Sequence, residues 1–212
     1  MDIWIGIPTG GRAAQAAETV AKWKAAGFKV AVYTWDEREK IEADYRFTGL
    51  LNTFPILQNL LAGHVFMSRG FSVYICGADD LWPGNATPRL IHKAAQKSPW
   101  KVIWAKDGMA NHVATHPIIT RSWFERHDRK IFDEKFNHNY CDTDLTARCA
   151  DSGELVKCFD IGFEHRHWLK NLRTKDSLDE WALDKVAADK AYYYSKHKDR
   201  PNLSNVPEIK IL

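Results

Sequence analysis

The stretch that decides the fold is DIWIGIPTGGRAAQAAETVAKWKAAGFKVAVYTW, residues 2–35. It opens with an apolar run that the turn residues PTGGR end, as expected of a buried strand. An Ala-rich segment follows, with Val20 and Trp23 on one helical face, and it stops at Gly27. A second apolar run, FKVAVYTW, completes a strand–helix–strand unit, which predicts parallel strands joined by a right-handed crossover.

The same alternation continues along the chain. Further strands are expected in FSVYICGADD, KVIWAKDG and KCFDIGFEHRHW, and HPIITRSWFERH is expected to run from a strand into a helix. Helices are expected within residues 41–70, with Pro55 near a helix start, and in ATPRLIHKAAQK, CDTDLTARCADSG and SLDEWALDKVAADKAYYYSKH. We therefore predict a single α/β domain over residues 1–197, an open and mostly parallel sheet flanked by helices, followed by a polar tail over residues 198–212.

The composition fits one globular domain. Of 212 residues, 45% are hydrophobic and 27% are charged, and the net charge of +3 permits a polyanionic partner without arguing for one. The four cysteines form no C-x-x-C pair, and we find neither a secretory signal nor a run long enough to span a membrane. These features predict a cytoplasmic protein with reduced thiols.

Acidic residues follow two of the expected strands. Asp36 ends one of them, and the adjacent Asp79 and Asp80 end another. Ligands of open α/β sheets bind beyond the carboxyl ends of the strands. Two neighbouring carboxylates repel each other unless a cation, a helix N-terminus or solvent compensates them, and a divalent ion bridging substrate phosphates would do so. Alternatively, one of the pair caps the turn at residues 82–84, and Asp36 is only a solubility charge or a cap.

Two later stretches carry further candidates. In CDTDLTAR, Asp142 lies near a helix start, where it is either a cap or a general base, whereas Asp144 and Arg148 have the spacing of a helical ion pair. In FEHRHW, His165 and His167 share one face of a strand, which indicates metal or phosphate contact. We see no third soft ligand at a spacing typical of zinc sites.

These motifs, in this order, resemble those of small glycosyltransferases of the GT-A fold, especially family 2-like members. IGIPTGGR is similar to the family's opening strand and nucleotide-binding turn, and YTWDE to its second strand. GADDLWPG is similar to the family's DADDLWP form, and FDEKFNHNYCDTDLTAR to its F-x-E-x-F…EDxDLxxR stretch. The chain departs from the family at two positions, since Gly77 replaces the first acid of the DxD motif and Cys141 replaces the Glu before the base.

The resemblance implies a metal-dependent, inverting transfer of a sugar from a nucleotide-sugar donor, with a UDP-sugar favoured, and Asp142 as the base. It places Mn²⁺ or Mg²⁺ on Asp79 and Asp80 together with His165 or His167. The donor would contact Pro8, Thr9, Arg12, Asp36, Asp79 and Trp82.

The acceptor is predicted less directly. Basic residues in AKDGMANHVATHPIITRSWFERHDRK, among them His112, His116 and Arg121, would suit a nucleic-acid backbone, but with a net charge of only +3 solvated helix faces are the favoured explanation. The motif style resembles phage enzymes that glycosylate hydroxymethylated bases in DNA, so modified DNA is the first acceptor to consider and a glycan the second. A nucleotidyltransferase, or a non-catalytic nucleotide- or nucleic-acid-binding module, is the alternative.

Overall fold

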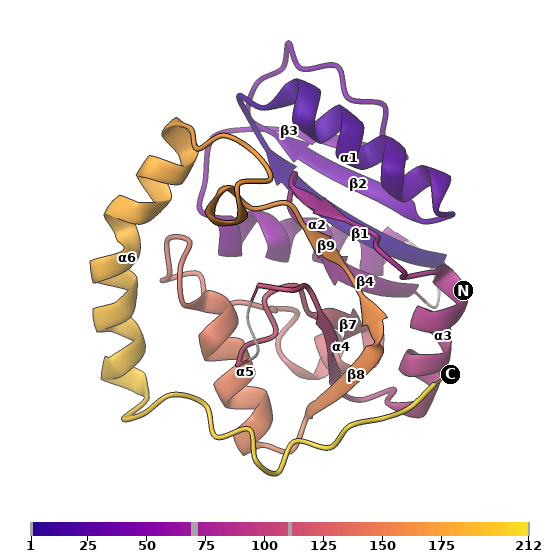
Figure 1. The fold of residues 1–212 in the computed structure, drawn as a ribbon, viewed down its shortest axis with the longest axis vertical. Helices are drawn as coiled ribbons and strands as arrows, with labels where there is room; N and C mark the ends of the chain where they lie inside the picture. The colour runs from indigo at the N-terminus through magenta and orange to yellow at the C-terminus, as the bar shows by residue number, and fades with distance from the viewer. Residues whose placement is uncertain (1, 69–71, 110–111, 212) are drawn as a thin grey trace.

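The computed structural model describes residues 2–68, 72–109 and 112–211, and a seven-stranded sheet forms its centre (Figure 1). The strand order is β3-β2-β1-β4-β7-β6-β8, and β7 runs antiparallel to both neighbours while the other pairs are parallel. A separate two-stranded sheet pairs β5 with β9. The strands are β1 (Asp2–Thr9), β2 (Lys29–Thr34), β3 (Tyr45–Thr48), β4 (Ser72–Cys76), β5 (Leu81–Trp82), β6 (Val102–Lys106), β7 (Ile118–Thr120), β8 (Leu155–Gly162) and β9 (Glu164–His165).

Helices cover both faces of the sheet. One core cluster joins the sheet to α1 and α3, and the other joins it to α2, α4 and α5. Strand β1 illustrates why both faces need cover: Ile3, Ile5 and Ile7 face the first cluster, and Trp4 faces the second. The strand is therefore apolar and buried on both sides, as is typical of parallel strands. The helices are α1 (Ala13–Ala25), α2 (Phe54–Ser68), α3 (Pro88–Lys97), α4 (Arg121–Arg126), α5 (Cys141–Asp151) and α6 (Ser177–Lys196), with a 3₁₀ turn at Trp168–Lys170.

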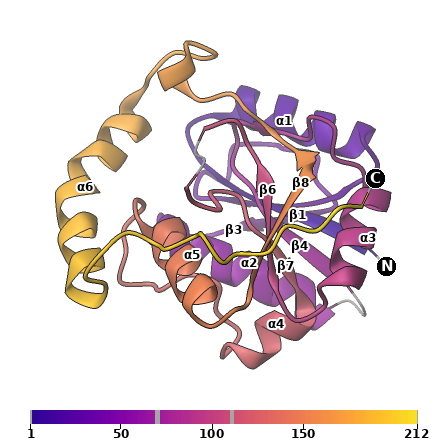
Figure 2. The same cartoon turned by 60° about the horizontal axis from the view of Figure 1, so that its bottom comes forward.

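The last helix stands away from the sheet, on the left in Figures 1 and 2. Its start is fixed by a capping box, in which Asp176 accepts from the backbone N–H of Asp179 and Asp179 accepts from that of Asp176. Its middle is anchored by the buried Asp189, whose carboxylate accepts from three successive backbone N–H groups, those of residues 137–139, at 2.8–3.0 Å.

The polar tail runs back across the molecule to lie along β8 (Figure 2). The backbone of Lys157 donates to Pro207 O and accepts from Ile209 N, both at 2.8 Å. Val206 and Ile211 are buried at the ends of this contact, so the tail contributes apolar residues to the two cores.

The predicted fold class is confirmed: a mixed α/β domain with a mostly parallel sheet between helices. Strand β3 was not predicted. It is a short edge strand with alternating half-exposed and exposed residues, so it lacks the apolar run that marks the central strands. In the described residues, no helix combines the length and the apolar character that a membrane crossing requires.

Candidate active site

A cavity of about 500 Å³ opens at the carboxyl ends of β1 and β4. These strands are neighbours, and the strand order reverses between them: β2 and β3 lie beyond β1, whereas β7, β6 and β8 lie beyond β4. Open α/β sheets bind ligands at such a switch point. The volume lies within the range of small-molecule sites. The predicted residues that line it are Pro8, Thr9, Arg12, Asp79, Asp80, Asp142, His165 and His167.

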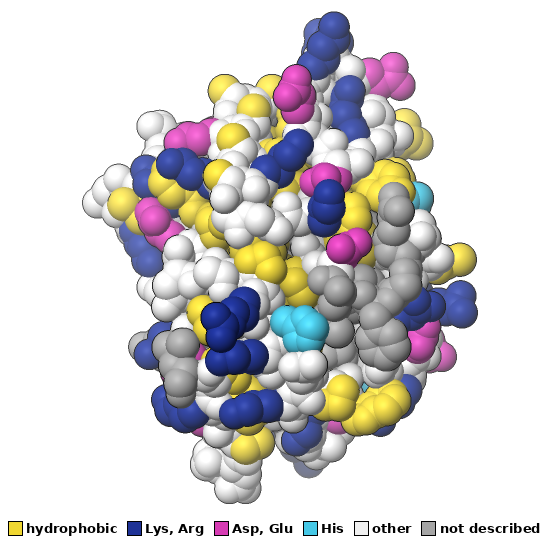
Figure 3. Space-filling view, turned by 90° about the vertical axis from the view of Figure 1, so that its right-hand side faces the viewer, with side chains coloured by type: hydrophobic (Ala, Val, Ile, Leu, Met, Phe, Trp, Pro, Cys, Tyr) yellow, Lys and Arg dark blue, Asp and Glu magenta, His cyan; other side chains and the backbone are white. Residues whose placement is uncertain are grey.

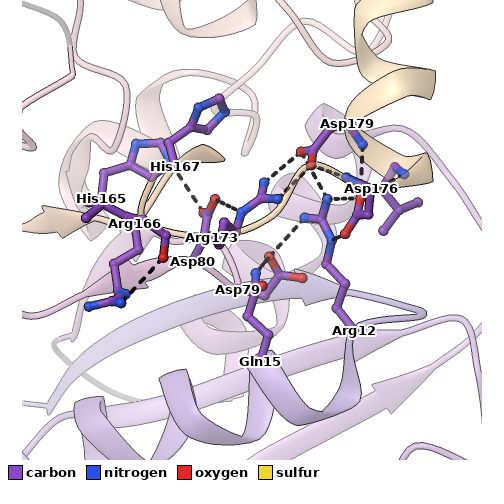
Figure 4. A network of polar contacts seen from close by, with 12 residues as sticks. Arg12, Gln15, Asp79, Asp80, His165, Arg166, His167, Arg173, Asp176 and Asp179 are labelled. Carbon is purple, nitrogen blue, oxygen red and sulfur yellow. Dashed lines mark hydrogen bonds and ion pairs between the residues drawn. The ribbon is translucent and has the colours of Figure 1, made fainter. Parts of the chain in front are cut away.

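Asp79 is buried and held by the last residue of β1 and by two residues that follow the strand. Thr9 Oγ1 donates to one carboxylate oxygen at 2.9 Å, and Gln15 Nε2 and Arg12 Nη1 donate to the other at 3.0 and 3.3 Å (Figure 4). Helix α1 also fixes the backbone here, since Thr19 Oγ1 donates to Asp79 O at 2.6 Å. Burial raises the pKa of Asp79 to about 6, and the charge of Arg12 opposes the rise.

Asp80 points toward a different set of donors. Its carboxylate accepts from Arg173 Nε at 3.1 Å and lies 3.3 Å from His165 Nε2 (Figure 4). Burial alone would raise the pKa of Asp80, but the hydrogen bonds and charges of His165 and Arg173 outweigh it and lower that pKa. The two adjacent carboxylates are therefore compensated by two guanidinium groups and an imidazole.

The contacts of Asp79 and Asp80 show whether the two carboxylates are available to bind the predicted divalent ion. Each of the four carboxylate oxygens of Asp79 and Asp80 already faces a protein donor. An ion bound between them would have to share these oxygens with the guanidinium groups of Arg12 and Arg173. As arranged here, the pair fits a guanidinium-neutralised subsite rather than an ion cage.

Both guanidinium groups also contact the start of α6, a connection that the sequence did not suggest. Arg12 donates to both oxygens of Asp176 at 2.6 and 2.7 Å, and Arg173 donates to both oxygens of Asp179 at 2.6 Å. Figure 4 shows the resulting chain of alternating charges, which runs from Asp80 through Arg173 and Asp179 toward α6. The Arg12–Asp176 and Asp80–Arg173 pairs lie 164 and 93 positions apart in the sequence, so no local motif reports these two contacts.

Asp142 lies in the first turn of α5, not at its cap. The cap is Tyr140, whose left-handed backbone (φ 61°) turns the chain into the helix. The backbone N–H of Thr143 donates to Asp142 Oδ1 at 2.7 Å. Desolvation raises the pKa of Asp142, and the charge of Asp107 adds to the rise while the donors from Thr143 oppose it. A carboxylate whose pKa is shifted toward neutrality suits proton abstraction at neutral pH.

The helical ion pair predicted in the same helix is confirmed. Arg148 Nε donates to Asp144 Oδ2 at 2.9 Å. The other oxygen of Asp144 faces Lys196 at 2.6 Å and His197 at 2.9 Å, so this fully buried carboxylate ties α5 to the end of α6.

The two predicted histidines both reach the cavity, but their surroundings differ. His165 is buried in β9, and burial would lower its pKa, yet hydrogen bonds to Asp107 and Asp80 raise it to about 9. His167 follows the strand and caps the 3₁₀ turn, accepting from Leu169 N at 3.3 Å. Desolvation and the nearby His165 lower the pKa of His167 to about 4, so it is neutral at pH 7.

The prediction of His116 as part of a basic surface is wrong. Its side chain is buried, with Nδ1 2.9 Å from Cys76 O and Nε2 3.2 Å from His165 Nδ1. Sequence reasoning also missed Asp107, which follows β6 and lies with His116 and His165 in one buried cluster. The imidazole of His116 is a polar group just before a buried strand, and only the fold shows that it faces the protein interior.

The two departures from the GT-A pattern have different structural settings. A Cβ on Gly77 would lie 2.5 Å from the side chain of Ile5 and 2.8 Å from Gly6 O, so the site has no room for the acid of a DxD motif. Cys141 is buried, and its thiol lies 3.2 Å from His138 O.

Two predicted donor contacts lie outside the cavity lining. Asp36 is paired with Arg38 through bonds of 2.7 and 2.9 Å, and the adjacent Trp35 lines the cavity in its place. Trp82 lies between two cations, with the Arg166 guanidinium 4.2 Å and the Lys22 ammonium 4.6 Å from its ring.

The predicted basic acceptor surface is largely neutralised. Arg121 pairs with Glu125 at 2.7 Å, Lys130 with Glu134 at 2.8 Å, and Arg126 with Glu154. On the face in Figure 3, Lys and Arg side chains gather in the lower part, whereas acidic and basic ones mix in the upper part. Positive charge is therefore unevenly distributed over this face. In the segment predicted to contact nucleic acid, the three basic side chains named above are each paired with a glutamate.

Comparisons with known proteins show the fold. No protein-family model and no curated protein sequence matches the chain. Among solved structures, S. aureus TarS matches with a TM-score of 0.57 at 9% identity, over 92% of this chain and 44% of TarS. TarS 1–349 matches with a TM-score of 0.52 at 8% identity, over 93% and 73%, and its complex with UDP with a TM-score of 0.53 at 9% identity, over 77% and 59%. The chain therefore spans less than half of the first TarS chain and shares its fold.

Proposed function

We propose that the protein is a glycosyltransferase that takes a sugar from a UDP-sugar and gives it to an acceptor hydroxyl. The observation that carries the proposal is the cavity at the β1–β4 switch point, where Arg12 and Arg173 lie in one lining with the carboxylate of Asp142. The fold shared with TarS, and the UDP in one TarS structure, favour a uridine nucleotide as the donor.

The chemistry follows from these residues. The acceptor hydroxyl gives its proton to Asp142 while its oxygen forms a bond to the anomeric carbon of the sugar. The bond between that carbon and the diphosphate breaks, and the electron pair leaves on the diphosphate. Arg12 and Arg173 stabilise the charge that develops there, in competition with Asp176 and Asp179. A single displacement of this kind inverts the anomeric centre.

The metal requirement stays a prediction. Mn²⁺ or Mg²⁺ would act as a Lewis acid on the diphosphate. Because the oxygens of Asp79 and Asp80 face protein donors, no step above is assigned to an ion bound between them.

The test uses donor turnover, which needs no known acceptor. Release of UDP from a panel of UDP-sugars, with water as acceptor, is measured for the wild-type chain, Asp142→Asn and Asp151→Asn. Asp151 is an exposed residue at the other end of α5 and serves as the matched control. Asp142→Asn is expected to lose roughly 100-fold or more in turnover with UDP affinity retained. Full turnover in that variant would remove Asp142 as the base, and absence of UDP binding by the wild type would refute the proposal.

The acceptor is a separate proposal. A hydroxymethylated duplex is the first acceptor to assay and a glycan the second, each with the donor that the panel identifies. Glycosylation of the duplex that weakens steeply with salt would support DNA, since phosphate contacts release counterions.

A further inference from the structure

Three side chains from separate segments meet beside the cavity. Asp107 follows β6, His116 precedes β7, and His165 belongs to β9. All three are buried, with exposed fractions of 4%, 5% and 7%. One potential ligand atom from each lies within 4.8 Å of the others. The cluster shares only His165 with the metal site predicted from the sequence.

The hydrogen bonds of His116 orient one nitrogen lone pair. Nδ1 lies 2.9 Å from the backbone oxygen of Cys76, and because a carbonyl only accepts, Nδ1 carries the proton. Nε2 of the neutral ring therefore carries the lone pair, and it points at Nδ1 of His165, 3.2 Å away.

In His165 it is Nε2, and not Nδ1 as in His116, that carries the proton fixed by an oxygen acceptor. Its Nε2 lies 3.3 Å from Asp80 Oδ1, and because an ionised carboxylate only accepts, Nε2 carries a proton. Its Nδ1 faces His116 Nε2 and lies 3.7 Å from Asp107 Oδ2. Two ring nitrogens directed at each other at this distance require a proton or a metal ion between them.

We propose that Asp107 Oδ2, His116 Nε2 and His165 Nδ1 bind a transition-metal ion of the zinc class. Zn–N bonds are about 2.0–2.1 Å long, so two nitrogens on one ion lie roughly 3.0–3.4 Å apart when the angle between the bonds is about 95–110°. The observed 3.2 Å falls in this range. Each ring nitrogen that does not bind the ion meets a carbonyl or a carboxylate, the second contact that fixes metal-binding histidines.

The ligand set also determines which ions fit. Two imidazoles and one carboxylate suit Zn²⁺, Co²⁺ or Mn²⁺, whereas Mg²⁺ and Ca²⁺ prefer oxygen ligands. Asp107 Oδ1 accepts from the backbone N–H of Met109 at 2.9 Å, and Oδ2 lies 3.7 Å from His165 Nδ1, within the cluster. Three protein ligands leave a coordination position open, and His116 and His165 both line the cavity.

The test is Co²⁺ binding by the full chain after chelation, in the absence of any donor, so that its outcome is independent of the proposed function. Co²⁺ is titrated and its visible ligand-field absorption is recorded. One ion per chain is expected, which excess Mg²⁺ does not displace. His116→Ala and Asp107→Asn should each weaken binding roughly 100-fold or more, whereas His92→Ala, a change on α3 remote from the cluster, should leave it unchanged.

A second measurement keeps the proposal testable if a variant does not fold. X-ray absorption of the Co²⁺-loaded wild-type chain counts the imidazoles on the ion, and two are expected. Failure of the wild type to bind Co²⁺, fewer than two imidazoles, or binding that survives in His116→Ala but is lost in Asp79→Asn would overturn the site. A proton between the two rings would then explain their contact.

Discussion

Replacement of Gly77 by alanine tests whether the chain can house the first acid of a DxD motif. The added Cβ would lie 2.5 Å from Cδ1 and Cγ1 of Ile5 and 2.8 Å from Gly6 O. Ile5 is fully buried in the centre of the sheet, and the oxygen belongs to the β1 backbone, which also accepts from Gly77 N at 2.9 Å. The Ile5 side chain can move only by disturbing the core packing, and Gly6 O only by disturbing the β1 backbone.

The magnitude follows from this geometry. Overpacking of a well-packed core costs about 1–3 kcal/mol. In a chain of this size, 1 kcal/mol shifts Tm by roughly 2–4 °C. Gly77→Ala is therefore expected to unfold roughly 2–12 °C below the wild type, and Gly77→Asp lower still because it also buries a carboxylate.

The matched control is Gly63→Ala within α2, where a Cβ would meet nothing within 4 Å. Alanine in a helix interior is more stable than glycine by about 0.5–1 kcal/mol, so this variant should gain stability. Thermal unfolding and urea unfolding, both followed by tryptophan fluorescence, measure the Tm and the free energy of unfolding of the two variants. If Gly77→Ala unfolds at the wild-type midpoint with an unchanged slope, the steric reason for the missing acid is wrong.

Three further predictions concern the anchor of α6, the buried acid and the nucleotide. Asp189→Ala should cost roughly 2–4 kcal/mol in urea unfolding because three backbone donors lose their acceptor, whereas the exposed Asp184→Ala should cost less than about 0.5. Because the pKa of Asp79 is raised to about 6, the native chain holds a proton that the unfolded chain has lost. The free energy of unfolding should therefore fall by up to about 3 kcal/mol as the pH rises from about 4 to about 6. The fall should be smaller in Asp79→Asn, and urea unfolding at several pH values in this range measures it. On the proposed function, calorimetry should find UDP binding weakened at least roughly fivefold in Trp35→Ala and little changed in Asp36→Asn.

Local patterns predicted most of the fold. The unit at residues 2–35 carries its own strand, helix and turn signals, and its apolar runs are long because β1 and β2 are buried by helices on both sides. Strand β3 lacks such a run because it lies at the edge of the sheet, where only pairing with β2 defines it. Short strands are likewise not separated by their residue pattern, so β8 and β9 were expected as one longer strand.

The site residues that follow the ends of strands could be predicted from the sequence. The partners that distant segments bring to them could not. Asp79 and Asp80 stand out because two acids follow an apolar run. Their partners Arg12 and Arg173 carry no such mark, since a solvated arginine gives the same sequence signal. His116 was assigned to the surface because its segment also contains basic residues such as His112 and Arg121, whereas the fold turns its ring toward His165.

The charges in the cavity link the proposed function to the proposed metal site. The charged residues that line the cavity include two arginines, Arg12 and Arg173, and four aspartates, Asp79, Asp80, Asp142 and Asp179. Even with His165 protonated, the carboxylates outnumber the cations, and a diphosphate would add further negative charge. Donor binding is therefore favoured if Asp79 retains its proton, if Asp179 releases Arg173, or if a cation enters with the donor. A divalent ion held by Asp107, His116 and His165 would replace the proton on His165 Nδ1, a net gain of one positive charge beside Asp80, so donor affinity should rise with that ion even though Asp79 and Asp80 keep their guanidinium partners.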